Sequence, residues 1–410
     1  MEGLSAQPCV GITAAAGEAL TPLLHAAPEE IGLSSAGLAR LSGALRREIE
    51  HGRVPGAVAL VAREGRVGYF ESFGQRDPAS GAPMTNDTIF RIYSMTKPIT
   101  SVAAMMLWEE GRFLLTDPIA KFLPEFADVS VARGGALEQV PAERPITIQD
   151  LLRHTSGLTY EFRGSGPVHK MYMSARVYSR TQSSADQVAT LAKIPLLDQP
   201  GTRWEYSRST DVVGRLIEVL SGVPLRVFFE TRLLAPLGMS DTAFHVPPRH
   251  HSRIAEAFAK DPESGGQVQL INVRDAPDFE SGGGGLVSTA SDYARFLQML
   301  LNGGTLEGSR FLSRKTIELM TADHLGPMTG AADLLLPGHG FGLGFAVRLH
   351  AGIAALPGSV GQYFWGGLAG TTFWVDPLEQ LFAILLIQAP GQRDYYRTLF
   401  RDLVYSAFDD

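Results

Sequence analysis

Apolar residues recur at helical spacing near the start of the chain and again in its middle. Behind Ser34, a good helix-capping residue, such a stripe is formed by Leu38, Leu41, Leu45 and Ile49. Three further stripes predict helices in the middle of the chain: Ile99, Val102, Met106 and Leu107; Val213, Leu216, Ile217 and Leu220; and Tyr293, Phe296, Leu297 and Leu300. Gly222 and Gly303 mark the ends of the last two.

Shorter runs rich in aromatic and β-branched residues predict strands towards both ends of the chain. Residues 57–62 and 66–73 flank a Glu64-Gly65 turn and predict a hairpin. Beyond residue 340, four more runs, separated by glycine or Asp-Pro, predict strands at 341–349, 359–365, 371–375 and 381–387. A last helix is expected over 393–407.

Strands at both ends with helices between them predict an α+β fold. The N- and C-terminal segments would form one antiparallel sheet flanked by helices, with a large, mostly helical domain inserted. The expected division is an N-terminal arm at 1–27, a sheet domain at 28–107 and 338–410, and a helical domain at 108–337, with the active site at the interface. Two Gly- and Pro-rich loops, 128–147 and 158–180, are long enough to be binding segments.

Composition narrows the function classes. The chain has 410 residues and a net charge of −7, which argues against nucleic-acid binding and against binding to an anionic membrane. Its one cysteine, Cys9, excludes an intrachain disulfide and a cysteine-based zinc site. Neither a signal peptide nor a membrane span is recognisable, so a cytoplasmic protein acting on a small molecule is expected. Whether it is a monomer or a homodimer stays open.

Ser94 and Lys97 are the first candidates for chemistry. Three positions apart at the start of a helix, they share one face, and the amine can then activate the serine hydroxyl. Pro98 is tolerated only in the first helical turn, so Ser94 must lie near the helix start. There its backbone N–H has no intrahelical partner and is a candidate oxyanion donor. Taken alone, the pair is more simply interpreted as a helix cap followed by a solvated lysine.

Two further segments become informative only in combination with this pair. Tyr206 lies in a polar stretch ahead of a helical stripe, where a buried core tyrosine is the simpler interpretation. Near the C-terminus, Trp365 is followed by Gly366, Gly367 and Leu368 between two predicted strands. Glycines there allow a ligand to approach the backbone, although packing at a sheet edge would explain them too.

In this order and spacing, the three motifs resemble the serine β-lactamase-like superfamily of class C β-lactamases and penicillin-binding peptidases. More narrowly, they resemble its esterase branch, the family VIII carboxylesterases. The resemblance covers residues 28–405 and includes the flanking segments 90–97, 150–158 and 283–289. It implies that Ser94 is the acylated nucleophile, that Lys97 shares its proton and that Tyr206 is the general base. The backbone N–H groups of Ser94 and Leu368 would form the oxyanion hole.

Two departures from the β-lactamase pattern bear on the substrate. Where those enzymes carry a cation that holds the substrate carboxylate, this chain has Trp365, expected to stack on apolar groups only. The loss of one such contact could cost about 1.5–3 kcal/mol. Arg208 replaces the usual asparagine of the second motif and could offer a cation to the substrate. The resemblance therefore implies an esterase for uncharged esters, with short acyl chains, that needs no cofactor or metal.

Alternatives within and outside the superfamily stay open. An acyltransferase, a weak β-lactamase or a D-Ala-D-Ala peptidase would use the same residues, and a binding domain could have kept the fold without catalysis. No Gly-x-Ser-x-Gly motif occurs, which argues against an α/β-hydrolase. His245, His250 and His251 lack a convincing zinc-ligand spacing, and His154 is interpreted as structural.

Overall fold

The computed structural model describes residues 23–133, 138–328, 330 and 334–409. Residues 1–22 of the expected N-terminal arm, and Cys9 with them, lie outside these ranges. The end of the arm runs beside the second strand of the main sheet, where His25 forms a bridge with Val67 and the Ala26 amide donates to the Val67 carbonyl at 3.1 Å.

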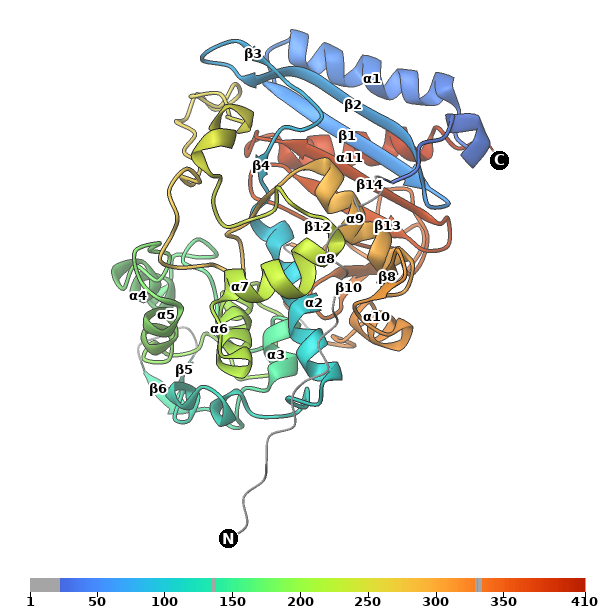
Figure 1. Ribbon diagram of the computed structural model, residues 1–410. Coiled ribbons are helices and arrows are strands. Elements are labelled where there is room, and N and C mark those ends of the chain that lie inside the picture. Colours follow the sequence, from blue (N-terminus) through green and yellow to red (C-terminus); the bar gives the residue numbers. More distant parts are fainter. Residues whose placement is uncertain (1–22, 134–137, 329, 331–333, 410) are drawn as a thin grey trace.

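An eight-stranded antiparallel sheet is the centre of the fold (Figure 1). Its order is β10-β11-β12-β13-β14-β1-β2-β3, so β1 (Gly56–Arg63) and β14 (Leu381–Ile387), from opposite ends of the chain, are neighbours, with Ala57 opposite Ile387. The expected antiparallel sheet built from both ends is thereby confirmed. The other strands of this sheet are β2 (Arg66–Asp77), β3 (Ala82–Pro83), β10 (His339–Phe341), β11 (Ala346–Arg348), β12 (Tyr363–Gly366) and β13 (Thr372–Asp376).

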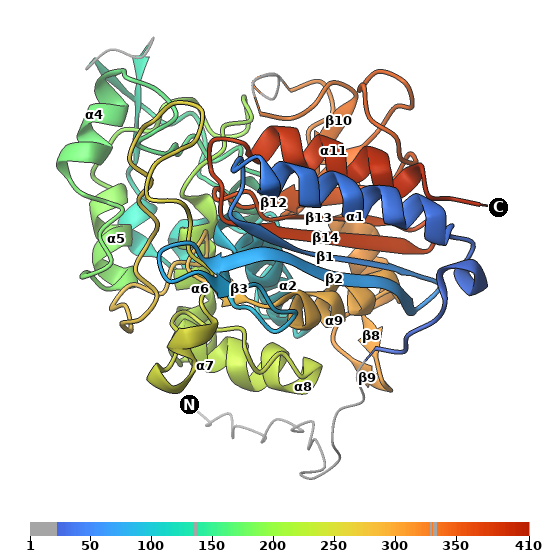
Figure 2. The same cartoon turned by 90° about the horizontal axis from the view of Figure 1, so that it is seen from above.

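Both faces of the sheet are covered, which explains why its central strands are apolar throughout. In β14, Phe382, Ile384 and Leu386 join the large core on one face, while Leu381 and Leu385 join a second core on the other face. Helices α1 (Ser35–Glu50) and α11 (Arg393–Tyr405) cover the second face (Figure 2). Helix α9 (Ala290–Leu301) lies against β14 and β1 from the first face.

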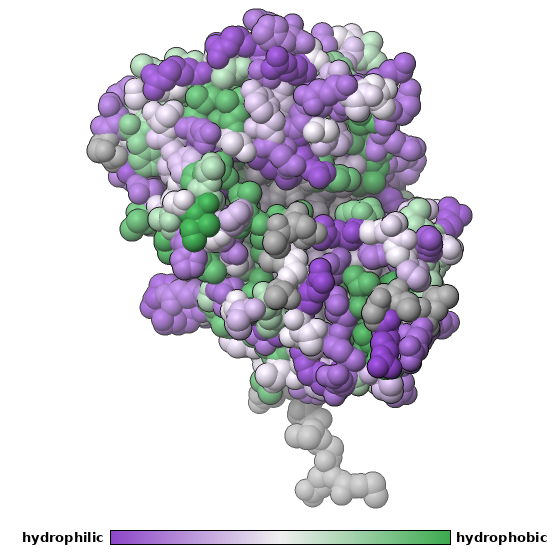
Figure 3. All heavy atoms as spheres, turned by 180° about the vertical axis from the view of Figure 1, so that it is seen from behind, coloured by the Kyte–Doolittle hydropathy of each residue, from purple (hydrophilic) through white to green (hydrophobic). Residues whose placement is uncertain are grey.

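Capping residues set the helix ends as the sequence predicts. The Ser34 side chain accepts a hydrogen bond from the Gly37 amide at the start of α1, and helix α6 (Ser209–Ser221) ends at Gly222 with φ of 75°. Hydrophilic side chains cover the upper end of the molecule, where α1 lies, as expected for the outer side of an amphipathic helix (Figure 3).

The middle of the chain is mostly helical and packs around α2 (Thr96–Glu109), which is buried along nearly its whole length. Two of the α2 neighbours are α6 and the short turn Tyr93–Met95 that precedes it. The remaining helices are α3 (Ile148–Leu152), α4 (Pro167–Ser174), α5 (Ser184–Leu191), α7 (Leu225–Phe229), α8 (Ala235–Leu237) and α10 (Arg314–Met320); the remaining strands are β4 (Phe90–Arg91), β5 (Ser130–Ala132), β6 (Gln139–Pro141), β7 (Val287–Ser288), β8 (Thr305–Leu306) and β9 (Ser309–Arg310).

Two predicted strands differ from the structure. The run 359–365 becomes a strand only at Tyr363, because residues 359–362 form a turn in which the Gln362 amide bonds to the Ser359 carbonyl at 3.1 Å. The run 341–349 is not continuous, because the chain reverses between β10 and β11, where the Gly342 amide bonds to the Phe345 carbonyl at 2.8 Å. Gly344 permits the turn with φ of 102°, and a Cβ there would lie 2.3 Å from the Ser101 hydroxyl. An apolar run can therefore hide a turn when its glycines are read as part of a strand. Among the described helices, none is long and apolar enough to cross a membrane.

Candidate active site

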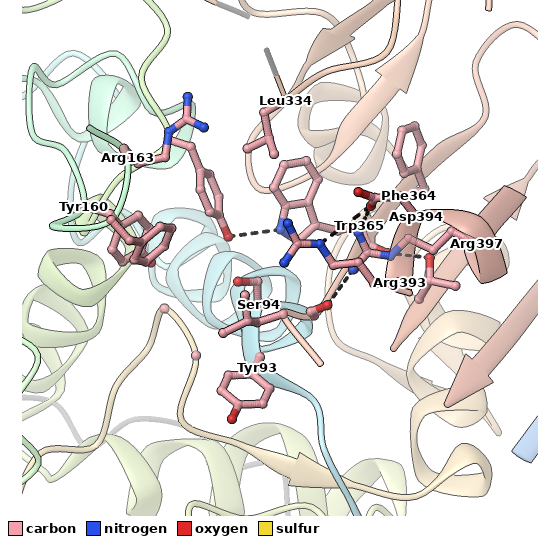
Figure 4. A pocket seen from close by; sticks show the side chains of 18 of the residues that line it. Tyr93, Ser94, Tyr160, Arg163, Leu334, Phe364, Trp365, Arg393, Asp394 and Arg397 are labelled. Carbon is pink, nitrogen blue, oxygen red and sulfur yellow. Dashed lines mark hydrogen bonds and ion pairs between the residues drawn. The ribbon is translucent and has the colours of Figure 1, made fainter. Parts of the chain in front are cut away.

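A pocket of about 960 Å³ opens between the sheet and the helical part of the chain. Its walls come from Tyr93 and Ser94, from the 160–163 segment, from Tyr206, from the 283–285 glycines, and from the segment that follows β12. Every residue that the sequence analysis placed in the site except Lys97 lines this pocket, and Lys97 lies directly behind Ser94. Ser94, Tyr206 and Trp365, which are far apart in the sequence, therefore line one pocket. Figure 4 shows Ser94 and Trp365 in it.

Ser94 is presented by a strained turn. It follows Tyr93, which has φ of 43°, a value that a bulky residue rarely adopts, in the 3-10 turn that leads into α2. The Tyr93 hydroxyl accepts the Ile271 amide at 3.0 Å, and the Leu286 carbonyl accepts the Ile92 amide at 3.1 Å. The position of Ser94 at the helix start is therefore confirmed, and contacts from distant segments fix it.

Lys97 is fully buried and its amine is fully partnered. The Nζ atom donates to the Gly283 carbonyl at 2.6 Å, to the Tyr160 hydroxyl at 3.0 Å and to the Ser94 Oγ at 3.4 Å. These use the three N–H bonds of an ammonium group. The Nζ atom also lies 4.5 Å from the centre of the Tyr206 ring, so aromatic faces contribute to the stability of a cation that has no carboxylate partner among the described residues.

Tyr206 connects Lys97 with the C-terminal strand. Its ring covers the amine, and its Oη atom accepts a hydrogen bond from the Trp365 indole N–H at 3.3 Å. The Trp365 indole is therefore also a donor to the candidate base, and the expectation that it stacks on the substrate stays a prediction. His154 also packs against Tyr206, with ring centres 4.9 Å apart, and its Nδ1 atom lies 3.1 Å from the Ser207 hydroxyl.

The loop after β12 is held against the nucleophile turn. A Cβ at Gly367 would lie 2.4 Å from the Ile92 carbonyl oxygen, so only glycine fits this approach. The Gly367 amide bonds to the Thr371 carbonyl at 2.8 Å, whereas the amides of Leu368 and Ser94 have no hydrogen-bond partner among the described residues. Two unpaired N–H groups at one pocket wall match what an oxyanion hole requires. Their assignment to that role, and that of Gly366 to substrate binding, stays a prediction.

Arg208 lies at the pocket wall and already forms ion pairs with two carboxylates. Its Nη2 atom is 2.6 Å from the Glu161 carboxylate, and its Nη1 atom is 3.2 Å from that of Asp211. Burial lowers the pKa of Arg208, but these two carboxylates outweigh burial and raise it. A substrate anion would have to compete with both, so the role of Arg208 in substrate binding also stays a prediction.

Two functional candidates escaped the sequence analysis. The first is Tyr160, whose hydroxyl accepts a hydrogen bond from the same Lys97 amine that contacts Ser94. Burial raises the pKa of Tyr160, with smaller contributions from Tyr206 and Asp211, and so keeps its phenol neutral. Asp211 accepts from the Gly283 amide at 2.8 Å and so fixes the carbonyl that Lys97 contacts. Within the described residues, no group of three or more His, Cys, Asp or Glu side chains lies together to hold a metal ion.

Known proteins resemble this chain over most of its length. The family model described as Beta-lactamase matches residues 41–405. Protein Rv1367c of Mycobacterium tuberculosis is 38% identical over 359 residues, covering 84% of this chain and 88% of that protein. Esterase EstB of Burkholderia gladioli is 32% identical over 408 residues, covering 92% and 98%.

A solved structure extends the likeness to three dimensions. EstCE1, described as a hydrolase with promiscuous acyltransferase activity, has a TM-score of 0.75 at 29% identity and covers 90% of this chain and 98% of its own. The family match, the esterase relatives and the Ser94–Lys97–Tyr206 cluster agree with one another. This chain belongs to the serine β-lactamase-like superfamily, in its esterase branch.

Proposed function

We propose that this protein is a serine carboxylesterase that works through an acyl-enzyme on Ser94. The observation that carries the proposal is the buried Lys97 amine, which contacts the Ser94 hydroxyl and lies over the Tyr206 ring. A serine hydroxyl attacks an acyl carbon efficiently only when a neighbouring group takes its proton. This cluster supplies that neighbour without a histidine within hydrogen-bond distance of Ser94 among the described residues.

In the proposed reaction, the Ser94 Oγ attacks the ester carbonyl carbon while its proton passes to the deprotonated oxygen of Tyr206, and the Lys97 amine, which donates to the Ser94 Oγ at 3.4 Å, holds the hydroxyl in place. The negative charge that develops on the carbonyl oxygen is stabilised by the amides of Ser94 and Leu368. The alkoxide leaves with the proton returned from Tyr206, and the acyl group stays on Ser94. Water, deprotonated by the same group, then attacks the acyl-enzyme and releases the acid. The Trp365 N–H stabilises negative charge on the Tyr206 oxygen in both half-reactions.

Esterase activity is favoured over β-lactam hydrolysis because the position of the usual carboxylate-binding cation holds Trp365. The esterase relatives support the same choice. Acyl-chain length is a separate matter. A pocket of about 960 Å³ is at the upper end of the range for drug-sized ligands, so its size does not require the short chains expected from the sequence.

Covalent labelling tests the proposal. Treatment with a fluorophosphonate, followed by peptide mass spectrometry, is expected to place the adduct on Ser94 and to abolish hydrolysis of p-nitrophenyl butyrate in proportion to labelling. Labelling at another serine, or no labelling of an enzyme that still hydrolyses the ester, would contradict the mechanism.

Acyl transfer to an alcohol is the second candidate, because EstCE1 is described as having promiscuous acyltransferase activity. The acyl-enzyme is common to both reactions, and only the acceptor differs. Product analysis at increasing concentrations of a primary alcohol separates them: new ester formed faster than free acid would identify a transferase.

A further inference from the structure

Three arginines at four-residue spacing form one side of α11: Arg393, Arg397 and Arg401, called here the arginine row. All three line the pocket. The neighbouring side of the helix, with Tyr396, Phe400 and Val404, packs in the core beneath the sheet. The packing of the apolar side therefore turns the arginine row towards the substrate space. Figure 4 shows Arg393, Asp394 and Arg397 beside Trp365, across the pocket from Tyr160 and Arg163.

The charges of the arginine row are poorly matched. Among the described residues, its one carboxylate within ion-pair distance is Asp394, whose side chain is 82% exposed and lies 3.6 Å from Arg393 and 3.4 Å from Arg397. Arg401 is 4% exposed and has no carboxylate within that distance among the described residues. Its Nη1 atom donates to the Gln362 side chain at 3.4 Å, and the guanidinium lies over the Phe364 and Trp374 rings.

One arginine of the row also has an N–H group without a hydrogen-bond acceptor among the described residues. Arg397 bonds to the Gly367 carbonyl at 2.5 Å, but its Nε atom is buried without a hydrogen-bond partner among the described residues. Burial lowers the pKa of Arg397 and of Arg401 to about 10, so both remain charged at neutral pH. Like charges four residues apart also destabilise a helix. Arg401 is buried without a carboxylate within ion-pair distance among the described residues, and the partly exposed Arg393 and Arg397 share one mostly exposed carboxylate, so a bound anion would offset the cost of this charge.

The row is close to the reacting atoms. Arg397 contacts the carbonyl of Gly367, which directly precedes Leu368, the candidate oxyanion donor. A further unmatched cation lines the same pocket: Arg180 donates to the Asn272 carbonyl, and its Nη2 atom is buried without a hydrogen-bond partner among the described residues. Six arginines line the pocket, but Arg208 pairs with Glu161 and Asp211 and Arg163 pairs with Glu205, so the excess of positive charge comes from Arg180 and the arginine row.

Apolar side chains complete the pocket. Phe162 and Leu368 line it and are 62% and 47% exposed, so an apolar ligand body would cover them. We propose that the arginine row binds an anionic group, a carboxylate or a phosphate, on an ester substrate whose body is apolar and whose scissile bond lies at Ser94. This inference rests on the esterase function proposed above and replaces the uncharged esters expected from the sequence.

Matched ester pairs test the inference. On the acyl side, p-nitrophenyl hydrogen suberate is compared with its neutral methyl ester. On the alcohol side, 4-(acetoxymethyl)benzoate is compared with its methyl ester and with the phosphonate of the same skeleton, which separates carboxylate from phosphate recognition. On at least one side, the anionic ester is expected to have a kcat/KM about tenfold above its neutral twin at low salt, and the advantage should shrink in 0.5 M NaCl.

Variants assign the effect to the arginine row. Arg393→Gln, a half-exposed position, and Arg401→Gln should each lower the anionic-to-neutral ratio about tenfold, whereas Asp394→Asn should raise it because it removes the competing carboxylate. Arg47→Gln, an exposed position on α1, is the control and should leave the ratio unchanged. Arg393→Gln keeps the test decisive if Arg401→Gln does not fold.

The outcomes separate the inference from the function on which it rests. The inference is wrong, and the esterase function stands, if neutral esters are hydrolysed and their anionic partners on both sides are slower. The same holds if the anionic-to-neutral ratio of kcat/KM does not change in the arginine-row variants. If no ester is hydrolysed, the esterase function is wrong. Binding then decides the inference: Ser94→Ala protein should bind monomethyl suberate about tenfold more tightly than dimethyl suberate, and equal affinities would overturn it.

Discussion

The cations near Ser94 and the cations on α11 are treated differently by the fold. Lys97 has three hydrogen-bond acceptors and an aromatic face, and Arg208 has two carboxylates. On α11, one exposed carboxylate serves Arg393 and Arg397, and none lies within ion-pair distance of Arg401 among the described residues. Both groups line or adjoin the same pocket, so the difference is not one of burial alone.

The difference separates two tasks. Groups that carry out bond making must keep one geometry while charge moves, and fully used hydrogen bonds provide that preorganisation. Groups that bind a charged ligand must keep donors open until the ligand arrives, at a cost to the unliganded protein. On this view the Lys97 cluster sets kcat, and the arginine row sets which ester is bound.

Removal of the nucleophile should have the largest effect. Ser94→Ala is expected to lower kcat/KM for neutral and anionic esters by at least about 10⁴-fold, because no acyl-enzyme can form. The protein should nevertheless bind an anionic ester as before, since the arginine row is unchanged. Turnover can be followed by p-nitrophenol release and binding by calorimetry. Substantial residual turnover would show that another residue is acylated.

Removal of the phenol oxygen of Tyr206 should come next. Tyr206→Phe keeps the ring over Lys97 but removes the candidate base, and kcat should fall by about 10²- to 10⁴-fold with little change in the anionic-to-neutral ratio. Tyr160→Phe is the matched comparison, since Tyr160 also contacts Lys97 but is kept neutral by burial. A larger loss in Tyr160→Phe than in Tyr206→Phe would exchange the roles of the two tyrosines.

Trp365 lies between the two regions and should give an intermediate result. Trp365→Phe keeps an aromatic ring and removes the N–H that donates to Tyr206 at 3.3 Å. Loss of one hydrogen bond to a developing phenolate should lower kcat about tenfold. If the indole acts only as an apolar surface, KM should change instead, and steady-state kinetics on p-nitrophenyl butyrate would distinguish the two cases.

The sequence predicts best those features that a local pattern determines. The apolar run in β14 and the Ser34 cap indicate their elements directly, and the order of the three motifs identifies the superfamily. The break at Gly344 was missed because neighbouring apolar residues are buried on both sides of the turn.

Contacts between distant residues could not be predicted in the same way. Tyr160 is 63 positions from Lys97, and Asp211 is 72 positions from Gly283, so no spacing reveals either pair. The arginine row is visible as a four-residue repeat, but its orientation depends on which side of α11 packs on the sheet. The division of the chain at residues 107 and 337 likewise stays a prediction.

The last test uses Asp150, a buried carboxylate that is paired with two arginines, in contrast to the arginine row. Its replacement should change the stability of the protein and have little effect on kcat. Asp150 caps α3, is fully buried and contacts Arg144 at 2.6 Å and Arg153 at 3.0 Å. Burial raises the pKa of Asp150, but hydrogen bonds from Arg144, Thr147 and Thr155 outweigh burial and lower it to about 2. Asp150→Asn should therefore lower the free energy of unfolding by about 3 kcal/mol at pH 7.

The pH dependence of that difference identifies its cause. Because the folded-state pKa of Asp150 lies below the ordinary aspartate value of 3.8, its stabilisation is present above about pH 4 and is lost as the pH falls towards 2. The gap between wild type and Asp150→Asn in urea unfolding should accordingly shrink from pH 5 to pH 3. Asp186 is the control: it has the same capping position in α5 but is exposed and has no arginine partner in the part of the chain that the structure describes, and Asp186→Asn should cost less than about 1 kcal/mol. Equal losses of unfolding free energy in Asp150→Asn and Asp186→Asn would mean that capping alone stabilises α3. The ion pairs of Asp150 would then contribute nothing to stability, and the contrast with the poorly paired arginine row would fail.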